Sequence, residues 1–344
     1  MYRKKYCVTD CETATLPIAD EIANGDAQKK KKIAIMRPLI YDIGWTICDR
    51  DGFITDKKNF LIAETFSVPQ IFNTAYYKEK RPMYLELLKK GEIKLLPWND
   101  VMDVYLNDIK NVEAVGAFNS AFDFKKAIPF TELYISKIYS PDYANWYNIQ
   151  STICRNIAEN KPAYKKDEET YENDVFRFRN ETYPLFDLWG LSTKYLLNNY
   201  RYKNACLAHN MISDSGMFFK TSAESTYKYL KEQYDFEEAH TALDDAIIET
   251  YILSRITKRH ALETGIETFP FKALGETHDF IQENQKVKLE YTENVVNRMR
   301  EHYEQKYTAC VDNDNLIGYC TQVKRKLNGL EMYLGLPLTG GAAD

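Results

Sequence analysis

The chain has 344 residues, a formal net charge of −5 and a hydrophobic content of 44%. These values predict a protein that exceeds one average domain and buries a substantial core, and they exclude global disorder. The mild acidity argues against a protein that grips duplex DNA mainly through a basic face. It leaves enzymes of nucleic acids open, because acidic metal ligands contribute negative charge that bound cations neutralise.

The cysteines and the hydropathy bear on the compartment. None of the seven cysteines belongs to a CxxC pair, which favours reduced thiols and gives no zinc signature. The charged residues at 1–5 lead directly into a strand pattern, and no apolar run reaches the ~18–20 residues that a membrane helix needs. We therefore expect a cytoplasmic protein with no membrane partner.

The stretch "YCVTDCETAT", residues 6–15, places two carboxylates directly after a run of strand-forming residues. In a strand, Asp10 and Glu12 point to the same face, roughly 6–7 Å apart. Carboxylates that point together repel each other, so something must offset the repulsion. A bound cation and open solvent at a strand end are both possible answers at this point.

The next elements predict two more strands and a helical stretch. "LIYDIGWTICDRDG" and "ITDKKNFLIAETF" are strands joined by a hairpin turn at Asp51-Gly52. The polar stretch before them includes Lys29–Lys32, which we interpret as a solvated loop or as a phosphate contact. Residues 76–110 are predicted helical, with one helix ended by Gly91 and a second starting after Pro97.

The remaining elements predict an α/β protein with a ribonuclease-H-like arrangement, a mixed sheet flanked by helices. Residues 113–119 form a short apolar strand and 120–128 start a helix, whereas 129–183 is interpreted as an insertion, partly loop. Order returns where Asp187 is placed to cap a helix, and 242–258 is a further helix. A boundary near 260 separates this domain, residues 1–259, from a mostly helical C-terminal extension with a loose tail, 260–344.

Two further acidic motifs lie on these elements. "AFNSAFDFKKA", residues 117–127, puts Asp123 in the first turn of a helix that follows a strand. "AHTALDDAIIE", residues 239–249, carries His240 and Asp245. Five helical residues rotate by about 500°, so the two could not share a helix face. We expect His240 in the loop before the helix and Asp245 in its first turn or two, with Asp244 a solvated neighbour.

In order along the chain, Asp10-x-Glu12, Asn119-x-Ala121-Phe122-Asp123 and His240-x-Ala242-x-x-Asp245 resemble the three motifs of the DnaQ-like DEDDh exonucleases. The resemblance covers roughly residues 1–258. A second branch of the family has tyrosine four residues before the last aspartate, and Thr241 at that position indicates the histidine branch. The long stretch after "ETATLP" and the insertion depart from compact members and bear on substrate choice.

The resemblance implies a ribonuclease-H-like fold and a 3′→5′ exonuclease that releases 5′-mononucleotides from single-stranded or frayed 3′ ends. Asp10, Glu12, Asp123 and Asp245 would hold two Mg²⁺ or Mn²⁺ ions, about 3.5–4 Å apart in such sites. Carboxylate oxygens suit these hard cations. His240 would be the general base, since imidazole titrates near neutrality. The motif positions that lie near the terminal nucleotide in the family are Thr13, Asn119 and Phe122.

Three functions stay open on the sequence alone. The first is the 3′→5′ exonuclease with DNA as the favoured substrate. The second is an exoribonuclease or short-oligonucleotide nuclease, because no motif encodes a contact to a 2′-hydroxyl. The third is a scaffold that binds a polymerase or another replication or repair protein through residues 260–344.

Overall fold

A computed structural model describes residues 4–161, 174–266, 274–283, 289–311, 320 and 322–327. The chain forms two compact units, residues 1–192 with 236–268, and residues 193–235 with 269–344. The predicted division into 1–259 and 260–344 marks the point where the sequence becomes helical and charged, and it stays a prediction. The compact units differ from it because 193–235 group with the C-terminal residues.

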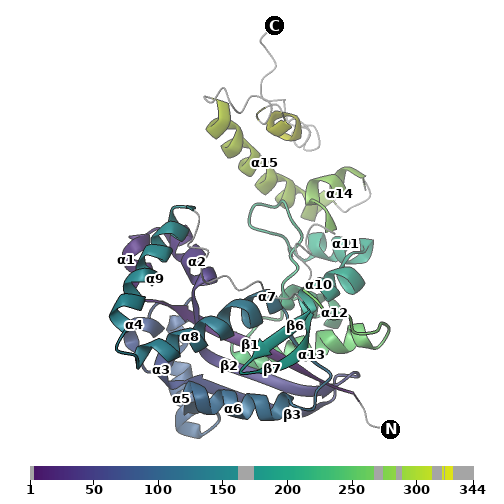
Figure 1. Cartoon of the computed structure of the whole chain (residues 1–344). Coiled ribbons are helices and arrows are strands. Elements are labelled where there is room, and N and C mark those ends of the chain that lie inside the picture. The colour runs from purple at the N-terminus through teal and green to yellow at the C-terminus, as the bar shows by residue number, and fades with distance from the viewer. Residues whose placement is uncertain are drawn as a thin grey trace. The chain divides into compact units, whose positions relative to one another are not determined.

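A seven-stranded mixed sheet forms the centre of the first unit, in the order β4-β3-β2-β1-β5-β7-β6 (Figure 1). β2 is antiparallel to both β1 and β3, whereas β5 is parallel to β1 and β7 is parallel to β5. The predicted α/β, ribonuclease-H-like fold class is thereby confirmed. The strands are β1 (Lys5–Thr15), β2 (Pro38–Asp49), β3 (Ile54–Ile62), β4 (Lys94–Leu96), β5 (Ala114–Ala117), β6 (Val175–Phe178) and β7 (Glu181–Asp187).

Helices and helical turns connect these strands. Before β5 they are α1 (Ile18–Ala23), α2 (Ala27–Met36), α3 (Ala63–Phe66), α4 (Pro69–Phe72), the 3₁₀ turn η1 (Lys78–Lys80), α5 (Arg81–Lys90) and α6 (Trp98–Ile109). After β5 they are α7 (Ser120–Phe122), the π-helical turn η2 (Asp123–Ala127), α8 (Ile128–Ile138), α9 (Tyr143–Ala158), α10 (Leu188–Ser192) and α13 (Ala242–Thr257). The predicted strand at 113–119 and helix at 242–258 are confirmed as β5 and α13.

The alternation of side chains along β2 assigns a helix to each face of the sheet. Thr46 hydrogen-bonds Thr250 of α13 at 2.5 Å between the two hydroxyl oxygens. The indole of the next residue, Trp45, points the other way and donates to Asp108 Oδ2 of α6 at 3.0 Å. α13 therefore lies across β1 and β2 on one face, and α6 lies on the opposite face.

Several local predictions are confirmed by hydrogen bonds. The hairpin at Asp51-Gly52 is held by Asp49 Oδ1, which accepts from the backbone N–H of Asp51 and of Phe53. Asp187 caps α10, because its Oδ2 accepts from Gly190 N at 3.0 Å. Its other oxygen accepts from Ser120 N at 3.0 Å. Asp187 therefore also ties the start of α10 to the turn after β5.

The structure corrects one sequence interpretation and adds detail to another. Lys29–Lys32 lie within the helix α2, not in a loop, because Asp26 caps that helix by accepting from Gln28 N and Lys29 N. The insertion at 129–183 is mainly α8, α9 and β6 in its described part. Its most polar stretch, 165–174, lies outside the described residues except for Asp174.

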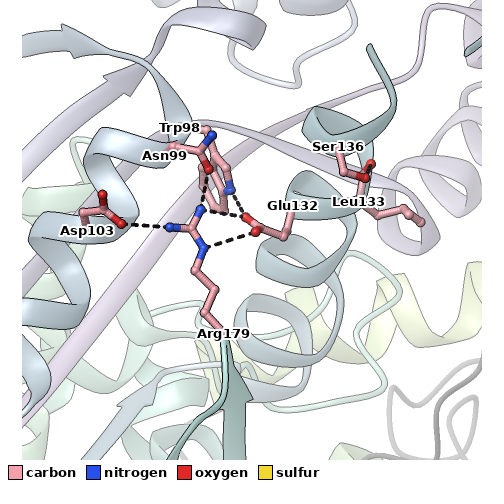
Figure 2. Close-up of polar contacts among 7 residues, drawn as sticks. All are labelled: Trp98, Asn99, Asp103, Glu132, Leu133, Ser136 and Arg179. Atoms are coloured by element: carbon pink, nitrogen blue, oxygen red, sulfur yellow. Dashed lines mark hydrogen bonds and ion pairs between the residues drawn. The ribbon is translucent and has the colours of Figure 1, made fainter. Parts of the chain in front are cut away.

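The turn between β6 and β7 is anchored by Arg179 (Figure 2). The guanidinium donates to Asp103 Oδ1 at 2.9 Å and to Glu132 Oε1 at 3.1 Å. It also donates to the side chain of Asn99, and the Trp98 indole donates to Glu132. One side chain thus joins this turn to both α6 and α8, which fixes the insertion's strand against the core.

The second unit has its own hydrophobic core. It contains the π-helical turn η4 (Thr193–Leu197), α11 (Tyr200–Ala208), α12 (Ala223–Lys231), α14 (Thr277–Glu283) and α15 (Leu289–Val311). Met299 and Tyr303 of α15 are buried with Tyr202 and Cys206 of α11. The predicted helical character beyond residue 260 is confirmed in the described part.

The cysteines match their prediction in part. Cys7, Cys11, Cys48, Cys154 and Cys206 are free and buried, whereas Cys320 is disulfide-bonded. The bonded cysteine departs from the predicted set of reduced thiols. Among the helices that the structure describes, each is too short or too polar to cross a membrane.

Gly44 of β2 lets α13 approach the sheet. A Cβ at this position would lie 2.3 Å from Leu243 N and 2.5 Å from the carbonyl carbon of Ala242. We expect Gly44→Ala to lower the free energy of unfolding by about 3 kcal/mol or more, at the upper end of overpacking costs, because backbone has to move. Urea unfolding measures this change.

Gly25→Ala is the control, because a Cβ there meets open space and the cost is confined to its positive φ of 85°. That cost is about 1–2 kcal/mol. If Gly44→Ala is no more destabilising than Gly25→Ala, the close approach of α13 to β2 is wrong.

Candidate metal and active site

Asp10 and Glu12 lie near the carboxyl end of β1, on the face that α13 covers. Asp10 is opposite Gly44 and Glu12 is opposite Asp42 in the β1–β2 ladder. The register shifts between Glu12 and Thr13, so the two carboxylates precede a bulge that bends the strand. Both side chains are half-buried, although β1 is a central strand of the sheet.

Asp123 is positioned by a tightly bonded turn after the neighbouring parallel strand β5. The Asn119 carbonyl accepts from Phe122 N at 2.8 Å and from Asp123 N at 3.1 Å. The Ser120 hydroxyl donates to the Phe186 carbonyl of β7 at 2.6 Å. Because parallel strands end at the same sheet edge, this turn brings Asp123, which is only 3% exposed, next to β1.

His240 and Asp245 are separated by a helix start, as predicted. Thr241 is the N-cap of α13, and its hydroxyl accepts from Asp244 N and donates to Asp244 Oδ2. Asp245 lies in the first turn and is 8% exposed, whereas Asp244 is exposed. His240 precedes the cap with a φ of +50°, a left-handed conformation that is uncommon outside glycine.

The three motifs converge although they lie far apart in sequence. Ligand-capable atoms of Glu12, His240 and Asp245 lie within 4.8 Å of one another. Asp10 interacts electrostatically with Asp123, Asp245 and Glu12. The structure therefore brings together all five residues predicted to be catalytic.

Burial and mutual repulsion raise the pKa of every carboxyl group in this cluster. The pKa of Asp123 rises to about 8 and that of Asp245 to about 7, both chiefly through burial. Burial and neighbouring carboxylates raise the pKa of Asp10 and of Glu12 well above their usual values. Lys80 counters this in part, because its charge lowers the pKa of Glu12 and of Asp245.

Two further carboxylates at this site were missed from the sequence. Glu249 of α13 is 2% exposed and accepts a hydrogen bond from Phe118 N at 3.1 Å. Its charge raises the pKa of Asp10. Asp42 of β2 is fully buried and accepts from Ala242 N at the start of α13. A signal existed for both: Glu249 is one helical turn after Asp245, and Asp42 is an acid in an apolar strand.

The chemistry of the cluster fits divalent cations. The Asp245 Oδ1 atom is buried and has no hydrogen-bond partner within the described residues. Such an atom is costly unless a cation or donor reaches it. The surrounding ligands are hard carboxylate oxygens with one imidazole, a set that suits Mg²⁺ or Mn²⁺. Asp10, Glu12, Asp123 and Asp245 could hold these ions.

The predicted substrate-binding residues lie around the cluster. Thr13 follows Glu12 directly after the bulge and is half-buried. Asn119 is exposed beside the Asp123 turn, whereas Phe122 packs partly against the core. Their contact with a nucleotide stays a prediction. In comparisons with known proteins, no family model, curated protein or solved structure matches the chain.

The raised pKa values predict an unusual pH dependence of stability in metal-free protein. Unfolded carboxyl groups ionise near 4, whereas Asp123 and Asp245 in the folded protein ionise at about 8 and about 7. Between these values the folded state binds more protons, so its stability falls as pH rises from about 4 to about 8. Each group held protonated contributes a slope of about 1.4 kcal/mol per pH unit.

Urea unfolding in EDTA across this pH range measures the slope. Mg²⁺ should restore stability at pH 8, and Asp10→Asn should make the metal-free slope shallower by removing one buried acid. Metal-free stability that is flat or rises through this window, and that Mg²⁺ leaves unchanged, would contradict the burial of these carboxyl groups.

Proposed function

We propose that this protein is a metal-dependent 3′→5′ exonuclease of the DnaQ-like DEDDh type. The observation that supports it is the meeting of four carboxylates and one imidazole, drawn from β1, η2 and the start of α13, at one sheet edge. Buried carboxylates of this number without paired cations are unfavourable, and phosphodiester hydrolysis gives a reason to gather them.

The metal ligands in this proposal are Asp10, Glu12, Asp123 and Asp245. Bound divalent cations would neutralise charge on the phosphate and help to activate the attacking water. The protein's own task is to hold the ligands before substrate arrives. Gly44 and Asp42 do so for the start of α13, and the turn at Asn119 does so for Asp123.

His240 is proposed as the general base. Its imidazole would take one proton from the water oxygen as that oxygen attacks phosphorus. The bond to the departing 3′-oxygen would break, and that oxygen would take a proton from solvent to become the 3′-hydroxyl of the shortened strand. Its Nδ1 lies 3.6 Å from Glu238 Oε2 and 4.0 Å from Asp245 Oδ2. His240 lies beside the proposed metal ligands and precedes the first residue of α13. This position suits proton transfer.

The favoured substrate is a single-stranded or frayed DNA 3′ end, because a chain of net charge −5 has little means to seize internal duplex. A polymerase or repair protein that binds residues 260–344 is a separate proposal, tested by a binding assay with the full chain. We also propose a cytoplasmic location, which the five free buried thiols favour although Cys320 is disulfide-bonded.

The function is tested with DNA and RNA strands labelled at the 5′ end and, separately, at the 3′ end. We expect stepwise shortening from the 3′ end with Mg²⁺ or Mn²⁺ and none in excess EDTA. The same assay with RNA distinguishes an exoribonuclease. Hydrolysis that persists in chelator, or efficient cutting of a blocked 3′ end, would overturn the proposal.

Asp10→Asn and Asp123→Asn should each reduce turnover by at least roughly 10³-fold, because each removes a negatively charged ligand while conserving shape. Both variants should be at least as stable as wild type in EDTA, since each relieves repulsion among buried acids. Asp244→Asn is the matched control, because its carboxylate is exposed and is not a proposed ligand, although its charge raises the pKa of Asp245. Near-normal turnover of either buried-site variant argues against the assignment.

His240→Ala should lower kcat by roughly 10²–10⁴-fold, the usual contribution of a positioned acid–base group. Metal affinity, measured by calorimetry, should change far less because His240 is proposed as a base and not as a ligand. The acidic limb of the rate profile should flatten in this variant and persist in Asp244→Asn. A variant that loses metal binding instead would make His240 a ligand.

A further inference from the structure

The imidazole of His240 is covered by an aromatic ring from a distant part of the chain. Tyr77, just before η1, stacks on His240 with ring centroids 4.4 Å apart and planes inclined by 17°. Tyr77 is half-buried, unlike its neighbour Tyr76, which is 84% exposed. The stack therefore uses the ring of Tyr77 to fix one face of the imidazole.

Lys80, three residues after Tyr77, forms hydrogen bonds to the backbone at the same histidine. Its ammonium donates to the carbonyl of Ala239 and to that of His240, the latter at 3.3 Å. The same nitrogen lies 4.5 Å from the centroid of the Tyr77 ring. A cation–π interaction thus links Lys80 to Tyr77.

The contacts from Tyr77 and Lys80 stabilise an uncommon backbone conformation at His240. Residues 236–241 belong to no helix or strand, and His240 has the left-handed φ of +50°. A non-glycine residue in this conformation costs on the order of 1–3 kcal/mol and persists only where surrounding contacts determine it. The two bonds from Lys80 hold the carbonyls on either side of this dihedral, and the stack from Tyr77 holds the ring.

We infer that Tyr77 and Lys80 are positioning residues that hold the His240 imidazole over the metal ligands. The inference rests on the proposed function, in which His240 accepts the proton of the attacking water. Neither residue takes part in the proton transfer. Tyr77 fixes the plane of the ring, and Lys80 fixes the backbone from which the ring projects.

The charge of Lys80 has a second effect at the same place. It lowers the pKa of Glu12 and of Asp245, the two carboxylates with a ligand atom within 4.8 Å of one on His240. The ammonium that hydrogen-bonds the backbone of His240 therefore also carries positive charge beside the proposed ligands.

Steady-state kinetics on a single-stranded 3′ end tests the positioning role. Tyr77→Ala should lower kcat by roughly 10²-fold with little change in KM, because a displaced catalytic group loses about that factor. Tyr77→Phe keeps the stacked ring and should restore most of kcat. Lys80→Met should also lower kcat, whereas Lys78→Met, an equal charge change on the exposed side of the same turn, should not.

A rise in KM with wild-type kcat in Lys80→Met would make Lys80 a substrate contact and overturn its positioning role. Tyr77→Phe that is as slow as Tyr77→Ala would likewise refute stacking as the cause. Thermal unfolding of each variant separates loss of positioning from loss of the fold.

A nuclear magnetic resonance measurement keeps this test apart from the nuclease assay. The ring protons of His240, identified among five histidines by their disappearance in His240→Gln, should carry a ring-current shift from Tyr77. That shift should vanish in Tyr77→Ala and remain in Tyr77→Phe. If wild type is inactive yet the shift behaves so, the proposed function fails while the stack stands. If the shift is absent from wild type, the stack itself is wrong.

Discussion

Several acidic side chains are gathered at the carboxyl ends of β1 and β5, where burial disfavours their charged forms. Burial raises the pKa values of Asp10, Glu12, Asp123, Asp245 and Glu249, and the charges of Asp123 and Asp245 raise those of Asp10, Glu12 and Glu249 further. An isolated buried charge costs several kcal/mol, so a cluster of this kind is stable only if protons or cations neutralise it. Protons do so in metal-free protein at low pH, and divalent cations would do so when the protein works.

The scaffold makes that unfavourable gathering possible through contacts that are individually ordinary. Gly44 admits the start of α13 to the sheet, and Asp42 accepts from Ala242 N at that start and from the Tyr84 hydroxyl at 2.8 Å. Asp187 and Ser120 hold the turn that delivers Asp123. The acids are therefore fixed by hydrogen bonds and packing outside the cluster, so that the proposed cations would bind with little rearrangement.

The sequence predicted what depends on short-range pattern. Strand periodicity gave β1 and β2, the helix rotation argument separated His240 from Asp245, and the cap at Asp187 was found from its residue type. Prediction from sequence failed where weak local patterns or contacts between distant segments determine the structure. α2 was missed because its lysine run hides a helix that buries little besides Ile33, and the stack of Tyr77 on His240 joins residues that no local pattern connects. Glu249 was missed because one acid on a helix is ordinarily a solvated residue.

Anomalous diffraction of Mn²⁺ in crystals of the wild-type protein tests whether these carboxylates hold divalent cations. We expect Mn²⁺ peaks bounded by the carboxylates of Asp10, Glu12, Asp123 and Asp245, with His240 near them but outside the ligand shell. We also expect these peaks to weaken in Asp10→Asn. Crystals soaked in Mn²⁺ that show no peak at this edge of the sheet, or a peak with His240 as a direct ligand, would contradict this assignment.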